Sequence, residues 1–573
     1  MNKCMRRLLT GAVFTVTALS TATAMAQQAQ QQTTTAAPGR VQEQFQFEGV
    51  PSRPTPNIEV RELAIQGAPA GAEDVSFRLD NLVIDGAVSY SDAELKSVYE
   101  DKLGQTITLA ELYGFAAQMT RKYRNDGYIL TQIVVPPQTI ENGTARLQVV
   151  EGYISQVRVE GEASPYAAEL INDYASQVRT DGRALSVAEL ERALLLINDL
   201  PGVNARAVLA PSAEVGAADL QIVIERDMVE GIVSVDNFGS RFLGPVQFTG
   251  AASLNSALGW NERFTLQTVY APEDADLGFE MAYVGFEYEQ PIFDKGTTIS
   301  TYYNVAHTDP GYTLSQFDVE GRSENYGVTV SHPFVRSRIT NITGRANLDF
   351  RDVESSNNFS STIQDRIRAA RVGARFDFLD RIFGVAFNAL DVEYSHGLTH
   401  FGARTDGAAN TTRAAAEPDF SKFTAELQRL QRMTSEVNLL IGLKGQYSNE
   451  ALYSSEEFGI GGYNFGRGFD SSEIIGDSGF AGKFELQWNE PVNIDLFEDY
   501  QVYSFFDAGR VFNEDPVTNS TKTDTLTSAG AGLRLDFTAD TQAGLAVAFP
   551  LNRDVQTQGD KDPKVYVNLS HRF

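Results

Sequence analysis

The sequence is poor in the residues from which many active sites are built. Its 573 residues include one cysteine, Cys4, and five histidines. Cys4 lies in a segment that we expect to be removed, so the mature chain can form no disulfide, cysteine-based zinc cluster or thiol nucleophile. No Gly-x-Ser-x-Gly motif occurs in a strand–turn–helix context, and paired carboxylates are too common in so acidic a chain to indicate a glycosidase. We therefore expect no catalytic residue, metal ion or cofactor.

Basic residues are also few. The chain has 47 lysines and arginines against 75 aspartates and glutamates, a net charge of −28. Binding of nucleic acid needs a basic face toward the phosphates, so this composition argues against that class of partner. The sequence contains no Walker-type Gly-Lys-Ser/Thr loop, which argues against an ATP site.

Long apolar runs are missing after the N-terminus, so the sequence predicts no transmembrane helix. The first 26 residues combine a basic start, an apolar stretch and a small-x-small ending, formed by Lys3, Arg6, Arg7, residues 8–19 and Ala24-Met25-Ala26. This pattern predicts a signal peptide over residues 1–26. A retained membrane anchor is the alternative, but the apolar stretch is too short to span a bilayer as a helix.

Residues 27–74 are rich in Gln, Thr, Ala and Pro, a composition typical of a flexible tether. Within it, Pro38-Gly39-Arg40 and the five residues that follow could begin a short helix. A plain linker is the alternative reading of the same stretch.

Residues 75–228 contain two copies of one α/β pattern, over 75–152 and 153–228, and each copy predicts the order β-α-α-β-β. The expected strands are 77–84, 128–135 and 145–150 in the first copy, and 154–160, 205–209 and 220–225 in the second. Capping-box pairs begin three of the helices, namely Ser91-x-x-Glu94, Thr108-x-x-Glu111 and Ser186-x-x-Glu189. One larger α/β domain is the alternative.

From residue 229 to 573 helical periodicity fades, and apolar and polar residues alternate. In residues 480–488, for example, Phe484, Leu486 and Trp488 fall on one face, opposite Lys483 and Glu485. The sixteen expected strands lie near 230–239, 246–256, 263–271, 279–290, 296–306, 323–333, 337–351, 366–378, 382–395, 419–431, 436–448, 479–489, 500–513, 525–537, 541–551 and 563–573. Long and short connections alternate between them.

This pattern predicts a transmembrane β-barrel of about sixteen antiparallel strands. Lipid offers no hydrogen-bond partners, so strands that span a membrane must close on one another, with short turns at one end and long loops at the other. A soluble β-sandwich or propeller is the alternative. It would expose its polar face to solvent, whereas here that face often carries charges flanked by glycine, as in a water-filled lumen.

One set of charged residues indicates a specific contact inside the barrel. The longest expected loop contains Gly466-Arg467-Gly468-Phe469, and two of the expected strands place Glu485 and Asp507 on their lumen faces. An arginine on a glycine-flanked loop can fold inward, and its planar guanidinium can bond two carboxylates. Each residue alone could be an ordinary solvated charge, but together they predict a latch between the loop and the barrel wall.

These features resemble the two-partner secretion transporters, which are outer-membrane exporters of large adhesins and haemolysins. Arg467-Gly468-Phe469 matches the family's loop-six motif, and Phe505, Asp507 and Gly509 match its F-x-D-x-G strand motif. Further similar segments are residues 136–138, 150–153 and 237–247. The chain departs from the family pattern at Gly466, where relatives often carry a β-branched residue.

The resemblance implies what the chain does and where. It implies two periplasmic POTRA modules that recognise a large unfolded exoprotein carrying an N-terminal secretion domain, and an outer-membrane barrel that exports it without ATP hydrolysis. Arg467 would latch the loop through Asp507 and Glu485, and the segment at Pro38 would plug the pore. Phe573 would be recognised by the barrel-assembly machinery during insertion, although a simple packing role is the alternative.

Other functions remain open at this point. An assembly factor of the same superfamily would insert other membrane proteins, but such relatives usually carry more than two POTRA modules. A passive porin would not need the tandem modules of residues 75–228. An outer-membrane enzyme would need the catalytic motifs that the sequence lacks.

Overall fold

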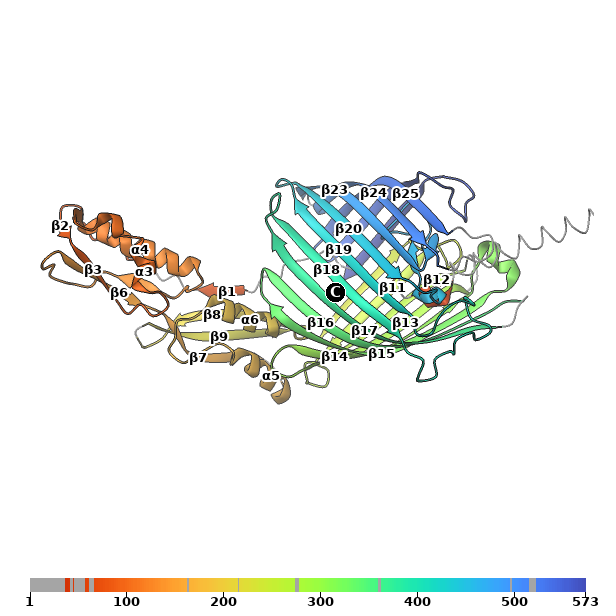
Figure 1. Ribbon diagram of the computed structural model, residues 1–573, viewed down its shortest axis with the longest axis horizontal. Coiled ribbons are helices and arrows are strands. Elements are labelled where there is room, and N and C mark those ends of the chain that lie inside the picture. The colour runs from red at the N-terminus through yellow and green to blue at the C-terminus, as the bar shows by residue number, and fades with distance from the viewer. Residues whose placement is uncertain are drawn as a thin grey trace, which may run out of the picture.

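A computed structural model describes residues 37–41, 45, 57–60, 66–161, 164–214, 216–273, 278–358, 362–494, 497–514 and 522–573. The predicted signal peptide and much of the predicted tether lie outside these residues. Two α/β modules stand in a row at one end of a large β-barrel (Figure 1). Within the described ranges, no helix has the length and apolar character needed to cross a bilayer.

Sixteen antiparallel strands form the barrel, which closes where β10 pairs with β27. The strands are β10 (Val229–Asp236), β11 (Gln247–Asn255), β12 (Arg263–Pro272), β13 (Phe279–Ile292), β14 (Thr297–Thr308), β15 (Glu320–Arg336), β16 (Thr340–Ser356), β17 (Ile363–Asp380), β18 (Ala386–Gly397), β19 (Ser421–Arg432), β20 (Val437–Ser448), β23 (Ser478–Ile494), β24 (Phe497–Phe512), β25 (Thr523–Thr538), β26 (Thr541–Pro550) and β27 (Lys564–Arg572). The predicted fold class is confirmed, and the soluble sandwich is excluded.

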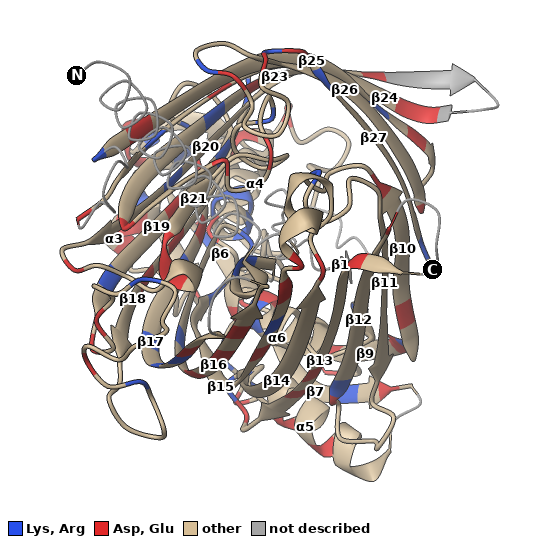
Figure 2. Cartoon of the chain, turned by 90° about the vertical axis from the view of Figure 1, so that its right-hand side faces the viewer, with Lys and Arg blue, Asp and Glu red and all other residues tan. Residues whose placement is uncertain are grey.

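Alternation along each strand divides the barrel into an outer and an inner surface. On β23, Phe484, Leu486 and Trp488 are exposed on the outside, while Glu485 and Gln487 between them are buried on the inside. The outer apolar face suits lipid, and the polar face lines the lumen. Figure 2 views the ring of strands from the end that carries the long loops, with charged residues distributed along the strands.

The seam that closes the barrel is short. Five residue pairs join β10 to β27, from Ile232–Arg572 to Asp236–Asn568. Beyond them, Gly231 and Phe573 exchange backbone hydrogen bonds of 2.8 and 3.0 Å. A Cβ atom at position 231 would lie 2.3 Å from the Phe573 ring, so this close approach requires glycine. The C-terminal aromatic residue is therefore part of the seam.

The longest connection, between β20 and β23, folds into the barrel. Within this connection, β21 (Phe458–Ile460) and β22 (Ile474–Gly476) pair as antiparallel strands. A 3-10 turn, η4 (Ser454–Glu456), precedes β21. We call residues 449–477 the inner loop. Other short helices are η1 (Pro38–Arg40), η2 (Glu100–Lys102) and η3 (Tyr312–Phe317).

The first module has the elements of the predicted β-α-α-β-β order and one more, a short strand β4 between the two helices. Its elements are β2 (Ser76–Leu79), β3 (Asn81–Asp85), α3 (Asp92–Lys96), β4 (Gln105–Thr108), α4 (Leu109–Asn125), β5 (Gln132–Val134) and β6 (Thr144–Val150). The three-stranded sheet has the order β3-β6-β5, and β2 pairs with β4. Residues 77–84 form two strands rather than one, because Asp80 and Asn81 donate backbone hydrogen bonds to Gly143. Residues 128–131 form a turn, so the expected strand begins later.

Helix starts follow the predicted capping boxes in the first module but not in the second. Ser91–Glu94 and Thr108–Glu111 each form the reciprocal box. Ser186 makes no side-chain cap. The Glu189 carboxylate instead pairs with Arg179 at 3.4 Å, which removes the second half of the expected box. The sequence pattern was therefore wrong about this cap.

The second module has the predicted order and its own core. Its elements are β7 (Tyr153–Glu160), α5 (Pro165–Ala175), α6 (Val187–Asn198), β8 (Val203–Pro211) and β9 (Ala217–Arg226). A fourth strand, β1 (Asn57–Val60), joins the sheet in the order β1-β8-β9-β7. It runs parallel to β8 and comes from the predicted tether, so part of that stretch is ordered.

A tight joint connects the two modules at Glu151-Gly152. A Cβ atom on Gly152 would lie 2.4 Å from Leu130, so only glycine fits there. Glu151 accepts hydrogen bonds from the Ser89 backbone at 2.7 Å and from the Tyr123 hydroxyl at 2.9 Å. Burial raises the pKa of Tyr123 above its ordinary value, so this hydroxyl remains a donor. The joint is thus held by both packing and hydrogen bonds.

The second module is bound to the turns at the near end of the barrel. Arg336 donates two hydrogen bonds to Asp199 in the segment after α6, at 2.7 and 2.6 Å. Arg338 pairs with Glu191 at 3.1 Å, and Arg226 donates to Asn261 at 2.7 Å. These contacts orient the module against the barrel mouth.

We expect Arg336→Ala to loosen this docking without unfolding the barrel. A partly exposed ion pair contributes about 1 kcal/mol or less, so the variant should widen the range of module positions rather than detach the module. The measurement is the distance distribution between spin labels at Asp173→Cys and Ser435→Cys, both exposed positions.

Arg345→Ala is the control, because Arg345 makes a similar two-bond contact with Asp391 entirely within the barrel. A distribution that broadens equally in both variants, or in neither, would contradict the docking role of Arg336.

Candidate functional site in the barrel lumen

Arg467 of the inner loop is buried against two carboxylates of the barrel wall. Its Nη1 donates to Glu485 on β23 at 2.7 Å, while Nε and Nη2 donate to the two oxygens of Asp507 on β24 at 2.9 and 2.7 Å. The side chains of all three residues are at most 3% exposed. The planar guanidinium thus bonds two acids on adjacent strands, an arrangement that a lysine could not reproduce.

The backbone of the loop tip binds the same aspartate. Asp507 Oδ2 accepts the N–H groups of Gly466 at 3.3 Å and Arg467 at 3.0 Å, and it also accepts the Ser528 hydroxyl at 3.4 Å. Because Asp507 is fully buried, these donors replace the water that its carboxylate loses. Asp507 is therefore a receptor for the whole loop tip.

Aromatic side chains complete the contact. The Arg467 guanidinium lies 3.5 Å from the centroid of the Phe505 ring, a cation–π contact. The Tyr566 hydroxyl donates to the Arg467 carbonyl oxygen at 2.7 Å. Phe505 of the predicted strand motif therefore has a direct structural role at the loop tip.

Three glycines allow the loop to approach the wall. Gly466 has a φ of +100°, a backbone conformation that would strain a β-branched residue. A Cβ atom on Gly468 would lie 2.8 Å from Ser528, and one on Gly509 would lie 2.6 Å from Ile460. The departure from the family pattern at Gly466 thus suits the backbone of this loop.

An apolar cluster packs beside the charged contact. Phe469 is fully buried in it, and its other members come from the inner loop, the barrel wall and a neighbouring loop. They are Phe458, Ile460, Phe465, Ile474, Ala481, Val511, Leu526 and Val555. Burial of an aromatic side chain of this size contributes about 1.5–3 kcal/mol, so the loop tip is held by packing as well as by charge.

One neighbour of this site, Arg534, was missed by sequence reasoning. Arg534 on β25 donates to the second oxygen of Glu485 at 2.7 Å, and its guanidinium lies 3.9 Å from the centroid of the Tyr503 ring. Glu485 is therefore shared between a wall arginine and the loop arginine. Arg534 lies in an expected strand, but the sequence does not give the register that brings it beside Glu485.

The structure brings seven of the eight candidate residues together, namely Arg467, Gly468, Phe469, Glu485, Phe505, Asp507 and Gly509. Phe573 lies apart, at the barrel seam. Over the described ranges, no group of three or more His, Cys, Asp or Glu residues is arranged to hold a metal ion.

Comparison with known proteins gives relatives along most of the chain. The heme/hemopexin transporter protein HuxB of Haemophilus influenzae (strain 86-028NP) is 25% identical over 481 residues, which is 81% of each chain. The outer membrane transporter CdiB of Escherichia coli is 22% identical over 84% of this chain and 81% of its own.

Solved structures show the same fold. CdiB from Escherichia coli superposes with a TM-score of 0.68 at 19% identity, covering 89% of this chain and 92% of that one. BamA from Haemophilus ducreyi, lacking its POTRA domains 1–3, gives a TM-score of 0.55 at 14% identity and covers 87% and 100%. At these identities the likeness concerns the fold alone.

Two family models match the chain. A POTRA domain of the ShlB type matches residues 77–152, and the haemolysin secretion/activation protein ShlB/FhaC/HecB matches residues 216–535, more than half of the sequence. The barrel therefore lies in the outer membrane with its modules in the periplasm. The chain belongs to the ShlB/FhaC/HecB family, the outer-membrane transporters of two-partner secretion.

Proposed function

We propose that this transporter exports one large exoprotein of the adhesin or haemolysin type, which reaches the barrel unfolded after the POTRA modules recognise its N-terminal secretion domain. The observation that carries the proposal is the inner loop, which occupies the lumen and is bound to its wall through Arg467, Asp507 and Glu485. A passive porin would need neither this loop nor the two modules.

The contact at Arg467 acts as a reversible latch. Removal of one partner from a buried ion pair costs about 3–5 kcal/mol, and water in the lumen lowers this figure. An extended polypeptide that enters the lumen brings its own amide and carbonyl groups, which offset part of that cost. The latch can therefore hold the loop at rest and release it during export.

Free sheet edges suit an extended cargo. In the sheets of the described modules, β5 is an edge strand of the first and β7 an edge strand of the second, whereas β1 covers the β8 edge. An unfolded segment can add to such an edge through backbone hydrogen bonds, with little dependence on its sequence. Recognition of the secretion domain is then set by the side chains beside the edge.

Export needs an energy source other than ATP hydrolysis by this chain, since its sequence has no Walker-type loop. Folding of the exoprotein outside the cell supplies a direction, because a folded segment cannot return through the barrel. The chain itself catalyses no reaction in this scheme.

Phe573 serves barrel insertion. Its backbone continues the seam beyond β27, and its side chain is 62% exposed, in reach of a binding partner. We assign it to recognition by the barrel-assembly machinery.

Loss of the gene should remove one very large protein from the cell surface or the medium and leave other outer-membrane barrels unchanged. Mass spectrometry of medium and outer membranes, with and without the gene, measures this directly and identifies the partner. A broad decrease in outer-membrane barrels would instead favour an assembly factor.

Arg467→Ala should leave the barrel inserted and lower export by at least about tenfold, because a large part of the latch energy is lost. Arg467→Lys should fail as well, since a single ammonium cannot bond both carboxylates in the same way. The readout is the secreted partner in the medium, with barrel folding checked by its heat-dependent migration in gels.

Arg553→Ala is the control for these variants, because Arg553 pairs with Asp524 at 2.8 Å outside the lumen site. Normal export by Arg467→Ala would remove the latch from the mechanism.

A further inference from the structure

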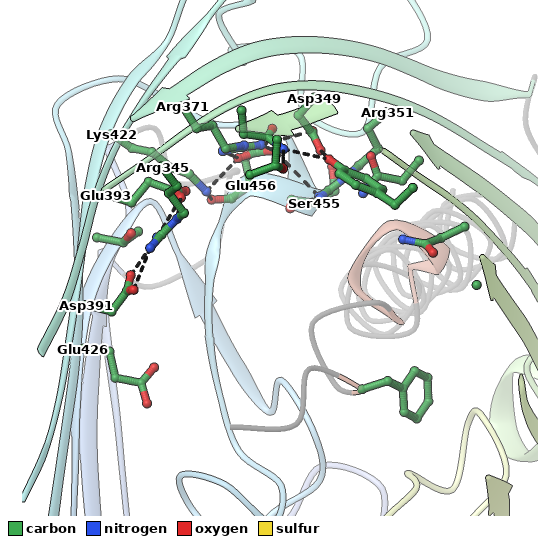
Figure 3. Close-up of a pocket in the computed structure, with 18 of the residues that line it drawn as sticks. Arg345, Asp349, Arg351, Arg371, Asp391, Glu393, Lys422, Glu426, Ser455 and Glu456 are labelled. Atoms are coloured by element: carbon green, nitrogen blue, oxygen red, sulfur yellow. Dashed lines mark hydrogen bonds and ion pairs between the residues drawn. The ribbon is translucent and has the colours of Figure 1, made fainter. Parts of the chain in front are cut away.

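The inner loop also buries several carboxylates, and one of them, Glu456, contacts other barrel strands than Arg467 does. Glu456 ends η4 on the limb of the loop that leaves β20, and its side chain is 1% exposed. It lies beside a lumen cavity of about 660 Å³, with other charged residues of the barrel wall around it (Figure 3). A carboxylate in this position needs compensation by nearby cations.

Cations from three strands surround the Glu456 carboxylate. Lys422 on β19 lies 2.6 Å from it, and Arg371 on β17 lies 2.8 Å from it. Arg351 on β16 is 3.6 Å away. Figure 3 shows these side chains converging on Glu456 from the wall. The site is a basic counterpart to the acidic one that receives Arg467.

The main chain of the same limb is also bound to the wall. The Glu456 carbonyl oxygen accepts hydrogen bonds from Lys422 at 3.1 Å and from Gln446 at 2.9 Å, and the Ser455 carbonyl oxygen accepts one from Arg351 at 2.8 Å. The limb is therefore anchored by its backbone and by its carboxylate at once.

Glu456 adds a negative charge to a part of the wall where three cations lie close together. Asp349 is the wall carboxylate next to the three cations, and it pairs with Arg371 at 3.3 Å while accepting the Tyr302 hydroxyl at 2.7 Å. Without Glu456, these three mostly buried cations would lose a carboxylate that contacts all of them. Their mutual repulsion would favour water and counterions in place of the loop.

We propose that Glu456 is a second positioning residue of the inner loop, which it locks to the basic site formed by Arg351, Arg371 and Lys422. This lock is independent of Arg467, because its partners lie on β16, β17 and β19 rather than on β23 and β24. The proposal rests on the proposed function in one respect, namely that the inner loop moves when the transporter works.

The limb that Glu456 anchors also contacts η1, the short helix near the N-terminus. Arg40 of η1 is buried and donates to the Ser454 carbonyl oxygen at 2.8 Å, and it contacts the Ser472 hydroxyl at 3.3 Å. A Cβ atom on Gly39 would lie 2.8 Å from the Ser455 side chain, so the two segments are in close contact. Release of Glu456 therefore disturbs both the loop and the segment that packs on it.

Planar-bilayer recording of the purified, full-length protein tests this lock without the exported partner. Glu456→Gln keeps the size of the side chain and removes its charge. Hydrogen bonds to a charged group stabilise more than hydrogen bonds between neutral groups, so this change should weaken the attachment of the loop to the wall. We expect the fraction of time in conducting states to rise about tenfold, equivalent to about 1.4 kcal/mol in favour of opening.

Asp391→Asn is the matched control. Asp391 borders the same cavity, but its bonds to Arg345, at 2.6 and 2.7 Å, join one wall strand to another. Arg345 keeps Glu393 at 2.9 Å when Asp391 is neutralised. This variant should conduct as the wild type does, and an equal increase in both variants would overturn the assignment.

Two further variants decide the outcome if Glu456→Gln does not insert. Lys422→Gln removes a partner from the wall and leaves the loop unchanged, so it should also raise conductance. Arg371→Gln also removes a wall partner of Glu456, which lies 2.8 Å from it, so it should raise conductance as well. Wild-type conductance in both Lys422→Gln and Arg371→Gln would overturn the proposal.

Conductance and export separate the two proposals. If Glu456→Gln and Lys422→Gln open the channel but no exoprotein depends on the gene, the lock stands and the proposed function fails. If export depends on the gene and on Arg467 while the Glu456 variants conduct as the wild type does, the function stands and the lock is wrong.

Discussion

A strand that crosses a bilayer must make its backbone hydrogen bonds with other strands, because lipid offers neither donors nor acceptors. In this protein that constraint is met by closing sixteen strands into one ring, with β10 paired to β27. Strand geometry then sends successive side chains to opposite faces. The face that meets lipid is apolar, so polar and charged side chains of the strands, such as Glu485 and Asp507, face the lumen. Closure of the hydrogen-bond ladder thus determines both where the pore lies and what lines it.

The charged residues that make the lumen polar also bind the inner loop that fills it. A ring lined by polar groups admits water and solutes unless something fills it, and here the inner loop enters from the long-loop end. Its tip buries a cation between Glu485 and Asp507, and its first limb buries an anion among Arg371, Lys422 and Arg351. Each buried charge is satisfied only while the loop is in place, so the cost of leaving it unpaired stabilises the closed arrangement.

The sequence predicted what depends on local pattern. Alternation with a period of two residues located all sixteen barrel strands, and motif spacing placed Arg467, Glu485 and Asp507 at one site. What it did not predict depends on register and long-range pairing. β1 was expected to be tether because nothing within residues 57–60 indicates that they will pair with β8. Arg534 and Glu456 were overlooked because their partners lie on strands whose alignment is set only when the barrel closes. The expected capping box at Ser186 did not form, and the Glu189 side chain pairs with Arg179.

The opposite signs of the two lumen sites also restrict how the inner loop can lie. If both sites were acidic, a loop with two cations could shift and exchange partners at little cost. Here Arg467 placed among Arg371 and Lys422, or Glu456 placed beside Asp507, would bring like charges together among mostly buried side chains, which is strongly unfavourable. The charge pattern therefore excludes alternative placements as well as stabilising the observed one. Because one site holds the loop tip and the other its first limb, release of the loop requires the loss of contacts of both signs, and a solute that screens or competes for one of them leaves the other intact.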